Sequence, residues 1–420
     1  MADSDTVTIE RHRQHVNAGM SRLAKLLGLG TEASASGAYV FDRDGNRYLD
    51  CGGYCVFLLG HCHPTVISAV KTQLEINPLS SRLMIHDEQS RAAASLARVS
   101  PEGLDYVWFA KSGAEAVEAA LKIARLNGKR RIITMHGAYH GKTLGALSVS
   151  GHPLYREPYQ PLLPDVDCIA FDDVDALEKK LVQYTNQCCV ILEPVQSERG
   201  VVIPSSGYLK AVESLCRHHG ALLIFDEISV GLGRIGHWWA SNREQVVPDI
   251  LLAGKALSGG VMPVSAAICS EEVFRPLNQD PMLHTSTFAA NPLACVAART
   301  TLEVIEQDGV IERSRQLGER LLRDVSKVLM HQSPHLIKEV RGLGLLLGIE
   351  FFQEGLAGEF FMELTSRHVI VSHSLNAHKV VRLTPPSVLS DADINWLLSA
   401  IHDSAGVLAA RHRNFSNKEI

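Results

Sequence analysis

An acid and a lysine, each at the end of a short apolar run, are the residues with the clearest chemical potential. Asp226 follows the apolar run in ALLIFDE (221–227), and Lys255 ends the next run, DILLAGK (249–255). A lysine among apolar residues is partly desolvated, which favours the neutral amine that attacks a carbonyl to form a Schiff base. Either residue alone is more often structural or part of a surface ion pair, so the prediction of a reactive site depends on the two together.

Pyridoxal phosphate is a cofactor that needs both groups. It is attached to a lysine through its aldehyde carbon, and an acid beside its pyridine nitrogen lets the ring accept electrons from a carbanion. Its phosphate needs an anion site, which Ser112, Gly113 and Ala114 can provide where a helix begins directly after YVWFA (106–110). Ser112 is equally an ordinary helix N-cap with Glu115 three residues later, and the two roles are compatible.

A glycine pattern just after Asp226 suggests a different cofactor. GLGRIG (231–236) spells G-x-G-x-x-G, the signature of a dinucleotide-binding loop. In that fold the glycines begin where the strand ends, a helix follows, and an acid ends the next strand. Here four residues separate Asp226 from the first glycine, HWWASNREQVVPD is a poor helix, and Asp249 begins the next apolar run. We therefore expect no nicotinamide cofactor.

The elements that must position these residues alternate between apolar runs and amphipathic segments. Residues 113–128 and 207–220 have apolar side chains at helical spacing and end at a glycine. This alternation predicts a mainly parallel sheet covered by helices on both faces, which brings the ends of neighbouring strands to one edge. The predicted strands are YVWFA (106–110), RIITM (131–135), CVILEP (189–194), ALLIFDE (221–227), DILLAGK (249–255) and PVSAAICS (263–270).

The C-terminal part of the chain predicts a smaller α+β domain. Residues 301–330 have the pattern of a long helix, and 391–410 that of a closing helix. Residues 340–351 and VVRLTPP (380–386) are interpreted as strands. GLGLLLG (342–348) is therefore a glycine-interrupted strand and not a phosphate loop.

Composition and charge exclude several classes of function. Of 420 residues, 46% are hydrophobic and 21% charged, and the formal net charge is −5. This balance argues against a nucleic-acid partner and against a polybasic protein surface that binds membranes. No apolar run approaches the length of a membrane span, and the N-terminus lacks the apolar segment of a secretory signal. We therefore expect a cytoplasmic protein with no nucleic-acid or membrane partner.

The nine cysteines are an odd number scattered through a long chain, which favours free thiols in a reducing compartment. One local cluster of cysteine and histidine does not match the separated ligand pairs of a zinc site. We therefore expect no metal at Cys51, Cys55, His61, Cys62 and His63.

Ordered motifs along the chain resemble those of class III pyridoxal-phosphate aminotransferases, such as the ornithine, acetylornithine and 4-aminobutyrate types. The resemblance spans roughly residues 40–390 and rests on GHCHP, SGAEAVEAALKIAR, GAYHGKTLGALSVSG, EPVQSERG, FDEISVGLGRIG, AGKALSGG, HTSTFAANPLA and VVRLTPP. It implies fold type I, an α/β fold with a large domain on a mainly parallel seven-stranded sheet and a small α+β domain built from both chain ends. The implied parts are an N-terminal segment at 1–59 that joins the small domain, a large cofactor-binding domain at 60–300 and a small domain at 301–420. A homodimer with shared active sites is also implied.

The same resemblance implies the cofactor contacts. Lys255 matches the Schiff-base lysine and proton shuttle, and Asp226 matches the partner of the pyridine nitrogen. The residues matched to the phosphate are Ser112, Gly113 and Ala114, with Ser286 and Thr287 for the phosphate of the other subunit. The residues matched to the ring are a stacking tyrosine, its neighbouring histidine and two residues on the side of the ring hydroxyl: Tyr139, His140, Glu193 and Ser229.

Substrate recognition is implied at four positions. Arg382 in VVRLTPP matches the arginine that binds the α-carboxylate of glutamate or 2-oxoglutarate, and a guanidinium fits a carboxylate bidentately. Glu198 in EPVQSERG matches the glutamate that covers this arginine when the substrate lacks that carboxylate. Lys142 and Tyr54 match two further substrate-binding positions. Without the resemblance, Arg382 would be interpreted as part of a surface ion pair.

Three positions depart from the family pattern. Lys142 stands where related enzymes often have Arg, and a lysine binds a carboxylate as a point charge instead of a fork. Ser229 replaces a Gln that contacts the ring hydroxyl and is too short for an identical contact. Lys111 replaces the Asn usual before Ser-Gly. These departures favour a specialised substrate and leave its identity open.

The resemblance implies a transaminase that moves an amino group between glutamate and 2-oxoglutarate, or another donor, and an amine, aldehyde or ketone. A decarboxylase or aminomutase with the same cofactor is the alternative, although no motif marks a second carboxylate for decarboxylation. A non-enzymatic protein on this fold is a third hypothesis. The presence of both Asp226 and Lys255 argues against it, because a protein without catalysis needs neither.

Overall fold

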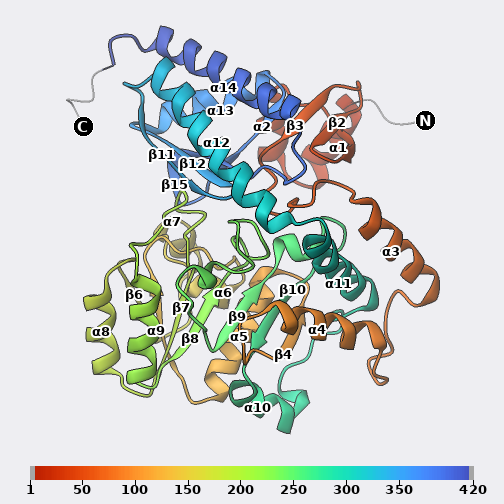
Figure 1. Ribbon diagram of the computed structural model, residues 1–420, viewed down its shortest axis with the longest axis vertical. Coiled ribbons are helices and arrows are strands. Elements are labelled where there is room, and N and C mark those ends of the chain that lie inside the picture. The colour runs from red at the N-terminus through yellow and green to blue at the C-terminus, as the bar shows by residue number, and fades with distance from the viewer. Residues whose placement is uncertain (1–4, 416–420) are drawn as a thin grey trace.

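A computed structural model describes residues 5–415, and its lower part in Figure 1 is built around one seven-stranded sheet. The strand order is β4-β10-β9-β8-β7-β5-β6. β10 is antiparallel to both of its neighbours, and the pairs from β9 to β6 are parallel, so the predicted mainly parallel sheet is confirmed. The strands are β4 (Tyr106–Ala110), β5 (Arg131–Met135), β6 (Val166–Ile169), β7 (Cys188–Leu192), β8 (Leu222–Asp226), β9 (Ile250–Ala253) and β10 (Ser265–Cys269).

Alternate side chains along the central strands enter two separate cores, one on each face of the sheet. Leu223 and Phe225 of β8 belong to one core, whereas Ile224 between them belongs to the other. Both faces are therefore covered, as a parallel sheet requires. The first core receives side chains from α4 (Asp87–Val99), α8 (Val174–Gln183), α9 (Tyr208–His218) and α11 (Pro292–Gln307), and the second from α5 (Gly113–Leu126) and α10 (Glu271–Gln279).

The upper part of Figure 1 combines both ends of the chain. Its sheets have the orders β1-β2-β3-β13 and β11-β12-β15-β14. The first sheet joins the two ends directly, because β3 pairs in parallel with β13 through Leu49 and Val369. The strands are β1 (Glu32–Ser36), β2 (Tyr39–Asp42), β3 (Arg47–Asp50), β11 (Ile337–Leu343), β12 (Leu346–Phe351), β13 (Val369–Ile370), β14 (Ser372–Ser374) and β15 (Ala377–Leu383).

Three helices of the C-terminal part, α12 (Val310–Gln332), α13 (Glu354–Ser366) and α14 (Asp391–Arg411), pack on these sheets and on one another. Other helices lie near the N-terminus or in the connections. They are α1 (Asp5–His15), α2 (Ala18–Leu26), α3 (Pro64–Ile76), α6 (Leu144–Ser148) and α7 (Pro153–Arg156), with the short 3-10 turns η1 (Glu157–Tyr159), η2 (Ala240–Arg243), η3 (Lys255–Ser258) and η4 (Pro281–Leu283).

Two predictions for the C-terminal part were wrong in detail. The single helix expected at 301–330 is divided between α11 and α12, because Gly309 between them adopts a left-handed φ of 60°. The single strand expected at 340–351 is a hairpin of β11 and β12, which turns at Gly344 with a φ of 51°. Each break lies at a glycine, where the chain changes direction with little steric cost. The strand β6 was not predicted.

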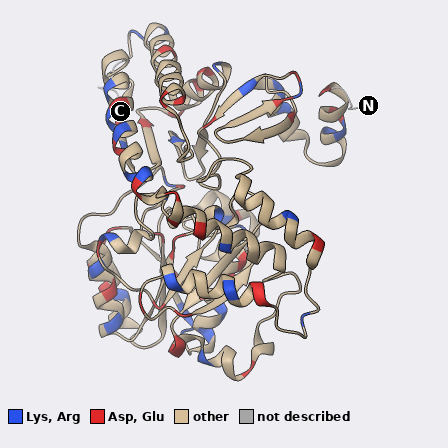
Figure 2. Ribbon diagram, turned by 45° about the vertical axis from the view of Figure 1, so that its right-hand side comes forward, with Lys and Arg blue, Asp and Glu red and all other residues tan. Residues whose placement is uncertain are grey.

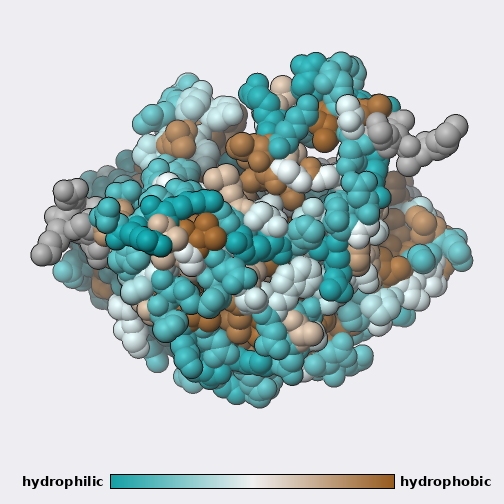
Figure 3. Space-filling view, turned by 90° about the horizontal axis from the view of Figure 1, so that it is seen from above, coloured by the Kyte–Doolittle hydropathy of each residue, from teal (hydrophilic) through white to brown (hydrophobic). Residues whose placement is uncertain are grey.

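The surface carries charges of both signs. Basic and acidic residues are interspersed on the helices in Figure 2. The face shown in Figure 3 is mainly hydrophilic with smaller apolar patches. Within residues 5–415, no helix combines the length and apolar character that crossing a lipid bilayer would require.

Candidate active site

Asp226 and Lys255 meet at one edge of the central sheet. Asp226 is the last residue of β8, Lys255 follows β9, and these strands are parallel neighbours in which Asp226 is opposite Leu252. A cavity of about 220 Å³ lies at this edge, where open α/β sheets place their ligands. It is lined by Gly113, Ala114, Tyr139, His140, Gly141, Lys142, Asp226, Ile228, Ser229 and Lys255.

A second cavity, of about 290 Å³, adjoins the first through Gly113 and Lys255 and is lined by Ser112 as well. Most of the residues predicted to bind a cofactor therefore line two connected spaces. Of the predicted cofactor residues, Glu193, Ser286 and Thr287 line neither cavity, and the same is true of three predicted substrate residues, Tyr54, Glu198 and Arg382.

The backbone and side chain of Lys255 are both held by serines. Lys255 has a φ of 42°, a left-handed conformation that is uncommon for residues other than glycine. The hydroxyl of Ser258 donates to its carbonyl oxygen at 2.7 Å, one turn along η3. Its Nζ donates to the hydroxyl of Ser229 at 2.6 Å. The amine is therefore directed into the cavity that Ser229 also lines.

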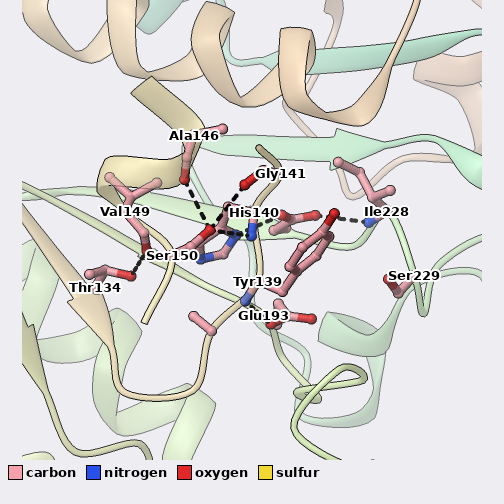
Figure 4. Close-up of polar contacts among 12 residues, drawn as sticks. Thr134, Tyr139, His140, Gly141, Ala146, Val149, Ser150, Glu193, Ile228 and Ser229 are labelled. Carbon is pink, nitrogen blue, oxygen red and sulfur yellow. Dashed lines mark hydrogen bonds and ion pairs between the residues drawn. The ribbon is translucent and has the colours of Figure 1, made fainter. Parts of the chain in front are cut away.

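Asp226 is buried and receives two hydrogen bonds. His140 donates from Nδ1 to Oδ2 at 2.7 Å, and the backbone N–H of Ile228 donates to Oδ1 at 3.1 Å. His140 is also buried, and its Nε2 has no partner among residues 5–415. Two hydrogen bonds to one buried carboxylate fix its orientation. Figure 4 shows His140 beside Tyr139, with Glu193 and Ser229 nearby.

The start of α5 has the features of an anion site. Ser112 is the N-cap, and its hydroxyl accepts the N–H of Glu115 at 3.3 Å. The N–H groups of Gly113 and Ala114 lie in the first turn, where no helix carbonyl can pair with them. A side chain at Gly113 would meet the side chain of Ile228 at 3.1 Å, so glycine keeps this approach open. Free N–H groups and the helix dipole favour a phosphate here.

Burial and, to a smaller extent, the charge of Asp226 raise the pKa of Glu193 to about 8. Glu193 Oε1 accepts the backbone N–H of Tyr139 at 2.9 Å (Figure 4). The side chain of Glu193 is therefore protonated at neutral pH and positions the backbone at Tyr139. The ring of Tyr139 is half-buried in the wall of the cavity.

Arg382 and Glu198 form a buried ion pair. Arg382 Nη2 lies 2.7 Å from Glu198 Oε1, with side-chain exposures of 0% and 3%. Arg382 Nη1 donates to the Ser197 hydroxyl at 2.9 Å, and the Leu375 N–H donates to Glu198 Oε2 at 3.0 Å. Burial alone would raise the pKa of Glu198, but the charges of Arg382 and Lys255 lower it. The pair therefore lies within electrostatic reach of the lysine.

The other predicted residues lie at the edge of the site or outside it. Lys142 is exposed, and its Nζ lies 4.3 Å from the centroid of the Tyr155 ring. Tyr54 is 53% exposed. Ser286 accepts a hydrogen bond from Lys111 Nζ at 2.9 Å, and Thr287 is exposed. The motif analysis did not select Tyr155, because its contact with Lys142 comes from the way the chain folds back between them.

The glycine loop and the cysteine–histidine cluster have structural contacts. Arg234, within the glycine loop, is fully buried and donates to the carbonyl oxygens of Leu345 and Pro385, which ties the central sheet to the C-terminal part. His61 is 2.8 Å from Asp50 through Nε2 and stacks on Phe57.

The groups in the site match what pyridoxal phosphate requires. An amine and a buried carboxylate face one cavity, free N–H groups lie at one end of it, and an aromatic ring forms a wall. The fold and the site together define a fold type I enzyme of the kind that uses this cofactor.

Comparison with known proteins identifies the family. The model of the class III aminotransferases matches residues 30–404. The putrescine aminotransferase of Pectobacterium atrosepticum is 41% identical over 405 residues, which cover 93% of this chain and 86% of that protein. The chain therefore belongs to the class III aminotransferases.

Solved structures agree with this assignment. The ornithine aminotransferase of Toxoplasma gondii, 32% identical, superimposes with a TM-score of 0.89 over 98% of this chain and 97% of its own. Another crystal structure of that enzyme describes partial occupancy of PLP at the active site. An (S)-enantioselective omega-transaminase from Thermomicrobium roseum is 26% identical, with a TM-score of 0.89 over 97% of this chain and all of its own. The protein is a PLP-dependent transaminase, and the decarboxylase or aminomutase alternative is not favoured.

Proposed function

We propose that one substrate pair of this transaminase is glutamate and 2-oxoglutarate, and that the other is a primary amine without an α-carboxylate and the matching aldehyde or ketone. The observation that carries this proposal is the buried contact of 2.7 Å between Arg382 and Glu198. A guanidinium binds a carboxylate strongly, but a bare buried guanidinium is costly when the substrate has none. A glutamate that can cover the arginine suits a site that must accept both kinds of substrate.

The residues around the cavity have complementary roles in this proposal. Pyridoxal phosphate, when bound, supplies an electron sink for the electron pair left on the reacting carbon of the substrate. Lys255 would carry the cofactor, and its Nζ would move the proton at that carbon. Asp226 would hold the proton on the pyridine nitrogen, and Tyr139 would pack against the ring.

Ser112, Gly113 and Ala114 bind the phosphate through the free N–H groups of α5. Ser229 and Glu193 would hold the side of the ring that carries the hydroxyl, and His140 orients Asp226 through its contact of 2.7 Å. The Ser229 hydroxyl also accepts the hydrogen bond from Lys255. In this proposal the same small side chain therefore positions the amine and contacts the cofactor ring.

The relatives support an amine as the second substrate. The protein from Pectobacterium is a putrescine aminotransferase, and putrescine is a diamine without a carboxylate. We infer a substrate of this chemical class. In this proposal Lys142, which lines the cavity, binds the distal carboxylate of glutamate. Tyr54 binds the distal part of either substrate, because the next residue, Cys55, donates its N–H to the hydroxyl of Thr384, two residues after Arg382.

A homodimer with shared sites is part of the proposal. The segment between α3 and α4 exposes a run of large apolar side chains, with Leu83 at 95%, Met84 at 81% and Ile85 at 91%. Apolar groups exposed to this extent favour a protein interface. Thr287 is exposed and lines neither cavity of its own chain, which suits a residue that reaches the phosphate site of a partner, with Ser286 beside it.

We also infer a cytoplasmic location. All nine cysteines are free thiols, a state that is typical of a reducing compartment.

The substrate proposal is tested with the purified holoenzyme and a matrix of amines and carbonyl acceptors. Glutamate and putrescine should each change the absorbance of the bound cofactor, and each should release its own carbonyl product. Alanine is the control donor, because it keeps the α-carboxylate but not the distal one. Turnover with the diamine but not with glutamate would contradict the assignment of Arg382.

A further inference from the structure

We propose that Tyr155 is a positioning residue for substrate recognition: its ring holds the ammonium of Lys142 for a distal carboxylate, and its hydroxyl ties the Glu198–Arg382 pair to the same ring. The inference rests on the proposed function, because it assigns Lys142 to the distal end of the substrate and Arg382 to the α-carboxylate. It adds a residue that belongs to none of the motifs.

The first half of the arrangement is the contact between Lys142 and Tyr155. Lys142 lines the cavity that Lys255 and Asp226 share, and its Nζ lies 4.3 Å from the centroid of the Tyr155 ring. Tyr155 lies in α7, across a narrow space that both residues line together with Tyr139. A cation at this distance from an aromatic face is attracted to it. The ring therefore restricts an otherwise flexible lysine to one side of the cavity.

The second half is the hydrogen-bonded path from Tyr155 to Glu198. The hydroxyl of Tyr155 donates to the carbonyl oxygen of Leu375 at 3.1 Å. The N–H of Leu375 donates to Glu198 Oε2 at 3.0 Å, and the N–H of Asn376 donates to the carbonyl oxygen of Glu198 at 2.9 Å. The turn between β14 and β15 is thus held between Tyr155 and Glu198.

The pKa shifts of two tyrosines are consistent with their proximity to Glu198. Burial raises the pKa of Tyr155, and the negative charge of Glu198 raises it further. The pKa of Tyr139 is raised by burial and by Glu198, and Tyr155 contributes as well. Tyr155, Tyr139 and Glu198 therefore lie close enough for the charge of Glu198 to act on both phenols.

The two substrate-binding cations differ in a way that this arrangement explains. Arg382 is neutralised by Glu198 at 2.7 Å. Lys142 forms no ion pair with a carboxylate in residues 5–415, and its recorded partner is the Tyr155 ring. An aromatic ring attracts the ammonium without neutralising its charge, so Lys142 can still bind a carboxylate. A dicarboxylic substrate would then engage both cations, whereas a monocarboxylic substrate with an uncharged distal end would engage Arg382 alone.

The test uses the holoenzyme and two unreactive probes, glutarate and valerate, which have chains of equal length but two carboxylates and one. Calorimetry gives both dissociation constants, and their ratio reports recognition of the distal carboxylate. Lys142→Met should abolish the preference for glutarate. Tyr155→Leu, which removes the ring, should lower the ratio by about threefold to tenfold. Tyr155→Phe, which keeps the ring, should leave the ratio unchanged.

The Phe variant also tests the hydroxyl. Without its bond to Leu375, the turn holds Glu198 less firmly, so Arg382 should be freed more easily for a carboxylate. Both probes should then bind more tightly by the same factor, about twofold to fivefold. Equal binding of both probes by Tyr155→Phe and the wild type would overturn this half of the proposal.

The double variant Lys142→Met/Tyr155→Leu decides whether Tyr155 acts through the lysine. Its probe ratio should equal that of Lys142→Met alone. A further fall, or an equal fall in Tyr155→Phe and Tyr155→Leu, would overturn the role of the ring. Arg382→Ala tests the proposed function separately from the role of Tyr155. If this variant binds valerate as tightly as the wild type, Arg382 does not bind the α-carboxylate, and the proposed function is wrong whatever the Tyr155 variants show.

Discussion

His140 donates from Nδ1 to Asp226 Oδ2 across 2.7 Å, and both side chains are buried at the end of β8. The second oxygen of Asp226 accepts the N–H of Ile228 at 3.1 Å. A buried carboxylate held by two donors is fixed in its direction. This is the environment that an acid beside a pyridine nitrogen needs.

Asp226→Asn should remove that charge with little change in shape. The pyridine nitrogen would lose its proton, and the ring would accept electrons less well. We expect single-turnover rates to fall about 100-fold or more, equivalent to ~2.7 kcal/mol in the barrier. Rapid-mixing measurements of one turnover check this, and a variant within about threefold of the wild type would refute the assignment.

Ser229→Ala should impair the placement of the free lysine. The hydroxyl of Ser229 accepts a hydrogen bond from Lys255 Nζ at 2.6 Å, and alanine removes this acceptor. Protein stripped of cofactor should then capture added pyridoxal phosphate about threefold to tenfold more slowly, the value of one hydrogen bond. Ser229→Thr keeps the hydroxyl and is the control. Equal capture rates for the Ala variant and the wild type would show that this contact is dispensable.

The raised pKa of Glu193, about 8 against an ordinary 4.5, predicts a specific pH dependence of stability. The folded chain keeps this proton up to about pH 8, whereas the unfolded chain releases it near pH 4.5. The free energy of unfolding should therefore fall as pH rises through this window, by at most about 1.4 kcal/mol per pH unit. Glu193→Gln cannot titrate and should lack this slope.

Denaturant unfolding of the cofactor-free wild type and Glu193→Gln between pH 5 and pH 8 measures the difference. Glu227, whose pKa burial raises to about 7, contributes equally to both proteins and cancels. Parallel stability curves for the two proteins would mean that Glu193 is ionised in the folded chain throughout this range.

The shared site of the proposed dimer predicts complementation between subunits. Lys255→Ala subunits should lose the cofactor absorbance and turnover, and Thr287→Ala subunits should bind the partner's phosphate weakly. A mixed dimer of the two has one site with both residues intact, so mixing should restore activity. Absence of recovery in confirmed mixed dimers, or a borohydride-reducible adduct on another lysine in Lys255→Ala, would count against these assignments.

The sequence predicted the parts of the fold and site that depend on local pattern. The apolar runs before Asp226 and Lys255 are β8 and β9, because buried parallel strands need continuous apolar residues. The glycine breaks at Gly309 and Gly344 were missed, because a glycine within an apolar pattern does not reveal whether the chain turns there.

Contacts between distant segments could not be predicted either. The path from Tyr155 through Leu375 to Glu198 joins three separate parts of the chain, and no spacing rule connects them. The contact between His140 and Asp226 could not be predicted for the same reason, since the two residues are 86 positions apart in the sequence. The boundaries at 59/60 and 300/301 stay predictions.

Stopped-flow measurement of the two half-reactions in Arg382→Ala and Glu198→Ala tests the central claim most directly. Arg382→Ala should weaken the glutamate half-reaction by a few kcal/mol, roughly the cost of losing one partner of a hydrogen-bonded charge pair, and should affect the amine half-reaction much less. Glu198→Ala should do the reverse, because it leaves Arg382 bare against an uncharged group and frees it for glutamate. Equal slowing of both half-reactions in both variants would contradict the account and make this ion pair structural.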